Sequence, residues 1–139
     1  MGLPIKEEDI RLVVRAFYAR VREDDLLAPI FATRIQDDSW DIHEDHITDF
    51  WSSIFLKTKQ FSGNPMRKHL ALKGLTPEHF TRWLSLFKQT SKHLLPPEKA
   101  ELLITMSRRI GESFQMGLAV HYENLGETDH PFKDFGIKK

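Results

Sequence analysis

The sequence predicts an all-α fold in a single domain. Apolar residues recur every three or four positions over 7–21, 40–57 and 77–94, which is the spacing of one face of a helix. A fourth and longest helix is predicted over 98–121, after the break imposed by Pro96 and Pro97, and no segment has the alternation of a β-strand. The 139 residues suffice for one domain with its own core. We expect that domain to span 1–126 and the polar tail, 127–139, to be mobile or loosely docked.

The first predicted helix begins at the acidic triplet Glu7-Glu8-Asp9, which suits the positive end of a helix dipole. Its apolar face includes Tyr18, and a buried hydroxyl without a partner costs roughly 1–3 kcal/mol. Tyr18 therefore either lies at the boundary with its hydroxyl in water or bonds a polar partner inside the protein. A short apolar turn is predicted over 26–31, where Phe31 has no obvious helix face to join.

The second predicted helix carries an aromatic-rich stripe with a histidine inside it. The stripe is formed by Trp40, Ile47, Phe50, Trp51 and Ile54. His43 falls within the stripe, whereas His46 lies at its edge and is expected to be solvated. His43 is either a core histidine bonded to a carbonyl group or a functional group in a pocket.

A lone histidine, His69, follows a rigid turn. Residues 62–65 are Ser-Gly-Asn-Pro, which is strong turn chemistry, and 66–72 can form barely two helical turns around His69. The next helix has Thr76 as its cap and Pro77 at the first position, where proline is tolerated. The apolar residues of that helix are Phe80, Trp83, Leu84, Phe87 and Leu94.

The longest predicted helix has two glycines in its body, Gly111 and Gly117. A glycine inside a helix costs about 1 kcal/mol relative to alanine. We therefore expect another helix to pack closely there.

Charge and composition argue against several classes of function. Lys and Arg number 20 and Asp and Glu number 20, a balance that disfavours a nucleic-acid-binding protein or a polybasic membrane anchor. The chain has no cysteine, which excludes disulfides, iron–sulfur clusters, thiolate catalysis and covalent haem attachment. No apolar run approaches the ~18 residues of a membrane span, and the N-terminus lacks a signal-peptide core. We expect no membrane association and a cytoplasmic location.

Three kinds of metal site compete for the histidines. A zinc hydrolase needs two histidines at His-Glu-x-x-His spacing and a third ligand, whereas His43 and His46 are three residues apart. A di-iron bundle needs paired Glu-x-x-His motifs, and the one such spacing, Glu127 to His130, falls in the tail. Haem needs one axial histidine and a large apolar pocket, which His69 and the aromatic stripes can supply. Haem is the favoured reading over a plain helical core.

The order of these motifs resembles the truncated haemoglobins, most closely their third group. The motifs are Phe17-Tyr18, Pro29-Ile30-Phe31, Trp40-x-x-His43, Phe50-Trp51, Gly63-x-Pro65-x-x-x-His69 and His79-Phe80-x-x-Trp83-Leu84-x-x-Phe87. The lack of a Gly-Gly motif also fits the third group. The resemblance spans about residues 10–118 and implies a two-over-two helical sandwich around non-covalent haem b.

The resemblance also implies roles for individual residues. His69 is the axial ligand of the iron, Tyr18 and Trp83 are distal hydrogen-bond donors, and His43 is a distal histidine. The remaining pocket residues are Phe31, which packs on the haem, with Ile47, Phe50, Trp51, Phe80 and Leu84. From their position alone, Arg67 and Lys68 are expected to contact the propionates.

The implied function is reversible binding of dioxygen and other diatomic ligands such as NO and CO. Two distal donors predict high oxygen affinity and slow release. Slow release favours NO detoxification or peroxide chemistry over transport, and such chemistry needs a reductase partner. The alternative is a haem-free helical interaction or sensor module, in which the aromatic stripes form only the core.

Overall fold

The computed structural model describes residues 5–32, 39–55, 75–127 and 129–133, and within them all regular structure is helical. The helices are α1 (Glu7–Val21), α2 (Ala28–Ala32), α3 (Trp40–Phe55), α5 (Pro77–Leu94) and α6 (Pro97–Asn124). The predicted all-α class is confirmed. The short helix predicted at 66–72 lies outside the described residues.

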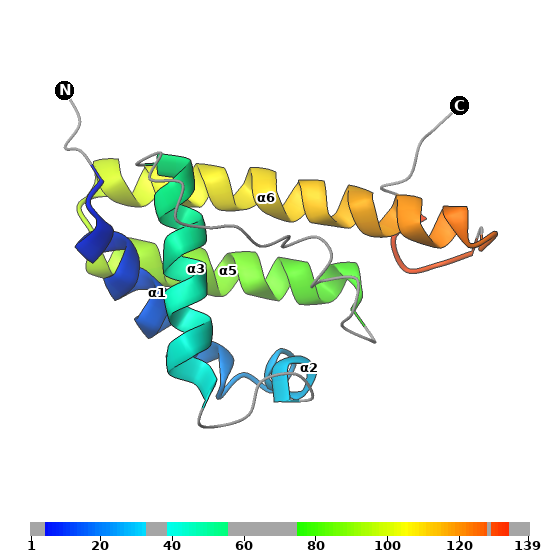
Figure 1. The fold of residues 1–139 in the computed structure, drawn as a ribbon, viewed down its shortest axis with the longest axis horizontal. Coiled ribbons are helices and arrows are strands. Elements are labelled where there is room, and N and C mark those ends of the chain that lie inside the picture. Colours follow the sequence, from blue (N-terminus) through cyan, green and yellow to red (C-terminus); the bar gives the residue numbers. More distant parts are fainter. Residues whose placement is uncertain (1–4, 33–38, 56–74, 128, 134–139) are drawn as a thin grey trace.

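The helices α5 and α6 form an antiparallel pair along the long axis of the molecule (Figure 1). In the same view α3 crosses this pair, and α1 packs against both α3 and α5. The bounds of α5 match the prediction, whereas α6 begins one residue earlier than predicted and ends three residues later. None of the described helices is both long enough and apolar enough to cross a membrane.

The segment predicted as a turn over 26–31 contains a helix, α2. Its start is held by Asp24, whose carboxylate accepts the backbone N–H of Leu26 at 3.0 Å and of Leu27 at 2.9 Å. These bonds satisfy donors that a helix entrance leaves without partners. Pro29 is the second residue of α2, where its missing N–H is not needed. Phe31 therefore lies on a helix, contrary to the prediction.

The helix α3 divides its predicted stripe between two faces. Its buried residues are Trp40, Glu44, Thr48, Trp51 and Ser52. Its half-buried residues on the neighbouring face include His43, Ile47, Phe50 and Ile54. The residues of the predicted stripe are thus all buried or half-buried, but the buried face also includes Thr48 and Ser52, small polar residues that hydropathy alone assigns to the surface.

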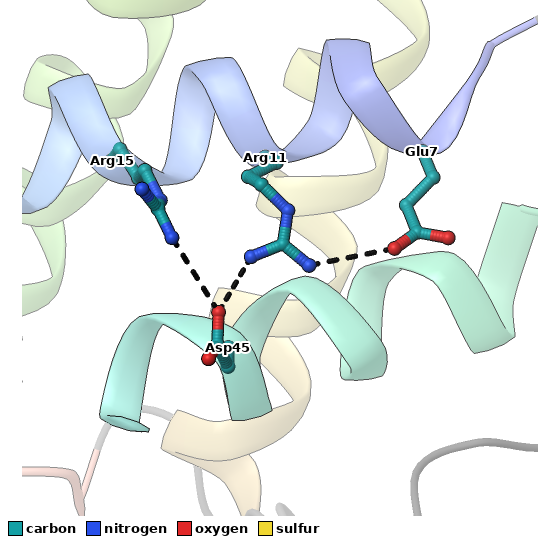
Figure 2. A network of polar contacts seen from close by, with 4 residues as sticks. All are labelled: Glu7, Arg11, Arg15 and Asp45. Carbon is teal, nitrogen blue, oxygen red and sulfur yellow. Dashed lines mark hydrogen bonds and ion pairs between the residues drawn. The ribbon is translucent and has the colours of Figure 1, made fainter. Parts of the chain in front are cut away.

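Charged side chains join the solvent-facing sides of α1 and α3 (Figure 2). Asp45 accepts a hydrogen bond from Arg11 and lies 3.6 Å from the guanidinium of Arg15, while Glu7 lies 3.4 Å from Arg11. All four side chains are at least one-third exposed. Each pair therefore contributes only about 0–1 kcal/mol, and the packing beneath them sets the geometry.

Glu44 is a carboxyl group on the buried face of α3, with 7% of its surface exposed. Burial raises the pKa of Glu44 above its ordinary value; the positive charge of Arg15 and Arg22 opposes the shift, and the negative charge of Asp41 and Asp45 adds to it. The folded chain therefore holds a proton on Glu44 more tightly than the unfolded chain does.

The described part of the tail folds back onto the end of α6. Gly126 has a φ of +83°, a left-handed conformation that glycine adopts without strain, just after the helix ends. Phe132 is fully buried with its ring 5.9 Å from that of Phe80, and the ring of His130 stacks 5.1 Å from that of Tyr122. Residues 129–133 thus pack on the helices, where Phe132 belongs to a second apolar cluster. The expectation of a mobile or loosely docked tail over 127–139 stays a prediction.

The helices α5 and α6 meet at Gly111, which lies under the side chain of Leu84. A Cβ atom added to Gly111 would lie 3.5 Å from the nearest Leu84 carbons, an ordinary van der Waals distance. The close packing expected at this glycine is present, and it still leaves room for a methyl group.

Gly111→Ala is expected to raise the free energy of unfolding by up to about 1 kcal/mol, because alanine removes the cost of glycine inside a helix without a clash. Gly126→Ala is the control with the opposite sign, since its positive φ makes alanine cost about 1–2 kcal/mol. Urea unfolding followed by circular dichroism measures both. A loss of stability in Gly111→Ala would show that the α5–α6 contact has no room for a methyl group.

Glu44→Gln is expected to raise the free energy of unfolding at neutral pH. Because the folded pKa is raised, ionisation of Glu44 above its ordinary pKa of 4.5 destabilises the fold increasingly as pH rises. Glutamine cannot ionise, so its advantage over the wild type should be largest near neutrality and vanish below that ordinary pKa. Denaturant titrations across this range test the prediction, with the exposed Glu23→Gln as control. A pH-independent difference would contradict it.

Candidate functional site

Tyr18 lies where three helices meet. The side chain, on α1, is 5% exposed. Its ring lies edge-on to Phe31 of α2 with centroids 6.0 Å apart, and edge-on to His43 of α3 at 5.0 Å. The structure therefore brings together three of the predicted site residues from segments far apart in the sequence.

Trp83 reaches the same point from α5. Burial is the main reason that the pKa of Tyr18 is raised; a hydrogen bond with Trp83 acts against this shift, and the charge of Glu44 adds to it. The indole N–H can only donate, so the phenol oxygen of Tyr18 accepts this bond. The alternative in which the Tyr18 hydroxyl faces water does not hold. The phenol stays protonated through the physiological range, and its own O–H remains available to donate.

Three helices also carry apolar side chains that are only half-buried, and all of these except Leu84 pack against the core cluster that contains Tyr18. They are Ile47 and Phe50 of α3, Trp83 and Leu84 of α5, and Met106 and Ile110 of α6. Half-buried apolar faces on several packed helices are what a large, flat, apolar cofactor would cover. The polar groups of Tyr18, His43 and Trp83 also fit a cofactor pocket, because such pockets are mostly apolar with a few polar groups. The described residues are thus compatible with the predicted haem.

Two predicted pocket residues, Trp51 and Phe80, are buried in the apolar core. Trp51 is 2% exposed and stacks on Phe87 with centroids 5.1 Å apart. Phe80 belongs to the second apolar cluster and lies edge-on to Phe132. Neither is on the half-buried face of its helix.

His69, Arg67 and Lys68 lie outside the described residues, so their predicted roles stay predictions. Among the other histidines, His79 is engaged at the start of α5, where its Nδ1 accepts the backbone N–H of Thr76 at 3.0 Å. This bond makes His79 part of the helix cap, and unsuitable as an iron ligand through that nitrogen.

Two residues of this region had no predicted role at the site. The ring centroid of Trp40 lies 5.4 Å from that of His43 and 5.7 Å from that of Tyr18. The guanidinium of Arg22 lies over the Trp40 ring, 4.9 Å from its centroid. The motif Trp40-x-x-His43 was the available signal, because residues three apart share a helix face. Glu44 had no predicted role because its burial depends on how α3 packs against the other helices, which the sequence does not show.

Comparisons with known proteins agree on one family. The model of the bacterial-like globin family matches residues 5–112. The chain is 32% identical over 113 residues to the group 3 truncated hemoglobin ctb of Campylobacter jejuni, a match that covers 80% of this chain and 89% of that protein. It also resembles the crystal structure of group III truncated hemoglobin from Campylobacter jejuni, with a TM-score of 0.76, 31% identity and coverage of 82% of this chain and 92% of that one.

A family model that spans most of the chain, a relative above 30% identity and a shared fold all lead to the same assignment. The chain belongs to the bacterial-like globin family, among the group III truncated haemoglobins.

Proposed function

We propose that this globin binds haem b non-covalently, with His69 as the axial ligand of the iron, and binds dioxygen, NO and CO reversibly beside Tyr18. Membership of the family implies a haem cofactor and suggests diatomic gas ligands. The haem, when bound, supplies the iron on which a diatomic ligand is held. The remaining work falls to side chains of the chain itself.

The hydrogen bond between Trp83 and Tyr18 is the observation that carries the proposal. Because Trp83 donates to the phenol oxygen, the Tyr18 O–H is left to donate toward a ligand in the pocket. Accepting one hydrogen bond polarises a hydroxyl and strengthens the bond that it donates. Trp83 is therefore a positioning residue, and Tyr18 is the direct donor.

The energy of that donor sets the expected ligand affinity. A diatomic ligand with partial negative charge gains about 1.5–3 kcal/mol from a hydrogen bond, which is roughly ten- to a hundredfold in dissociation constant. The raised pKa of Tyr18 supports this role, since the group remains a phenol rather than a phenolate. High oxygen affinity and slow release are the consequence.

His43 has a second distal role in the proposal. Its ring lies edge-on to Tyr18 and 6.3 Å from Phe31, so a rotation of the imidazole would change the space beside the phenol. Arg67 and Lys68 are proposed to contact the propionates. Slow release of oxygen favours NO dioxygenation or peroxide reduction over oxygen transport. Both reactions need a reductase partner. We also propose a cytoplasmic location.

Tyr18→Phe is expected to speed oxygen release about ten- to a hundredfold, because the direct donor is lost. Trp83→Phe should speed release less, because the Tyr18 hydroxyl remains. Stopped-flow displacement of oxygen measures both rates. Trp40→Phe is the matched control, since Trp40 touches the Tyr18 ring without a hydrogen bond to its oxygen. Unchanged release in both the Tyr18 and the Trp83 variant would refute the distal-donor role.

His69→Ala is expected to abolish the five-coordinate ferrous spectrum of a histidine-ligated haem, or to lose the haem. Added imidazole should restore the spectrum if only the ligand is missing, since free imidazole can take the place of the side chain. His93→Ala, at an exposed position of α5, is the control. A His69→Ala protein that kept the native spectrum would identify another histidine as the ligand. A wild-type protein without a Soret band would instead point to the haem-free module.

A further inference from the structure

Four aromatic side chains form a continuous stack between α3 and α5, here called the aromatic column. In order they are Phe55, Trp51, Phe87 and Trp83. Neighbouring ring centroids lie 5.9, 5.1 and 5.7 Å apart, and the planes of successive rings differ by 7°, 10° and 12°. Edge-to-face contacts are the common alternative in protein cores, and the contacts of Phe17 with the same region follow that alternative.

The two ends of the aromatic column differ in their surroundings. Trp83 bonds Tyr18 and is half-buried beside the apolar faces proposed to hold haem. Trp51 and Phe87, in the middle, are 2% and 1% exposed. Phe55, the last described residue of α3, is half-buried. The column therefore joins the proposed pocket to a second half-buried position, at the end of α3, through two rings that have almost no contact with water.

The residue types in the column suit electron transfer. Indole is among the side chains that are most easily oxidised by one electron, and the column contains two indoles separated by one phenyl ring. Phenylalanine is not oxidised under the same conditions, but its π system fills the gap between the two indoles face to face. A dry surrounding also lowers the reorganisation that moving a charge requires.

We propose that the aromatic column passes single electrons from Trp51 to Trp83 when hydrogen peroxide is reduced in the pocket. The inference rests on the proposed haem function. Peroxide takes up two electrons and two protons and its O–O bond breaks to give two waters. The bound haem would supply one of these electrons and Trp83 supplies the other, after which Trp51 returns an electron to Trp83. A small one-electron reductant in solution, of the ascorbate class, restores Trp51 at the Phe55 end and would also replace the electron given by the haem.

The experiment uses ferric holoprotein, with its Soret band checked first, and hydrogen peroxide without added reductant. Peptide mass spectrometry then quantifies oxidised tryptophan at Trp40, Trp51 and Trp83, the three tryptophans of the chain. Trp51 is expected to be oxidised despite its burial, and Trp40 to be spared. Ascorbate added before peroxide should protect Trp51, and haem-free protein should show no oxidation at Trp51.

Phe87→Leu and Phe17→Leu form a matched pair that isolates the column. Both phenylalanines are 1% exposed, and their ring centroids lie 5.7 Å (Phe87) and 5.8 Å (Phe17) from that of Trp83. The plane of the Phe87 ring makes an angle of 12° with the Trp83 ring, whereas the plane of the Phe17 ring makes an angle of 87°. Phe87→Leu should lower oxidation at Trp51 several-fold and raise it at Trp83, whereas Phe17→Leu should change neither. Trp51→Phe, which keeps a ring in place, should likewise raise oxidation at Trp83.

The outcomes separate the two proposals. A wild-type protein without a Soret band overturns the haem function and the electron route together. A normal Soret band with Trp51 unoxidised in the wild type, or equally oxidised in both leucine variants, overturns the route alone. If Phe87→Leu does not fold, unchanged Trp83 oxidation in Trp51→Phe overturns the route in its place.

Discussion

The hydrogen bond from Trp83 to Tyr18 is the interaction on which the candidate site depends. It joins α5 to α1 at a point where Tyr18 is buried and Trp83 is half-buried. Adjacent residues of a helix point about 100° apart, so α1 can use neighbours in different directions. Phe17 packs on Phe87 of α5, while Tyr18 faces α2 and α3. One turn of α1 therefore contacts both α3 and α5 and fixes their relative position. The hydrogen bond from Trp83 fixes the orientation of the Tyr18 hydroxyl.

Burial sets the chemistry of that hydroxyl. A phenol removed from water resists ionisation, and the nearby charge of Glu44 strengthens this resistance. Glu44 is itself held toward its neutral form by burial. The group beside the proposed ligand is thus a neutral donor whose proton does not depend on small changes of pH. A donor of this kind stabilises partial negative charge without adding a full charge to an apolar pocket.

Sequence reasoning predicted best where local rules decide the structure. The bounds of α5 follow from Thr76 and Pro77 at one end and from the double proline at the other. Prediction failed where packing decides. The face that α3 buries could not be read from hydropathy, because Thr48 and Ser52 are core residues. The packing of Phe132 on Phe80 joins residues 52 positions apart, and no local pattern signals such a contact. The segment with His69 lies outside the described residues.

The start of α5 packs against residues from the tail. Phe80 was predicted to line the pocket, and its ring packs on Phe132 from the tail. Leu75 belongs to the same apolar cluster and directly follows the segment that contains His69. The cluster also includes Leu118 and Ala119, beyond residues 5–112 that match the family model. Residues outside that match thus pack against the start of α5.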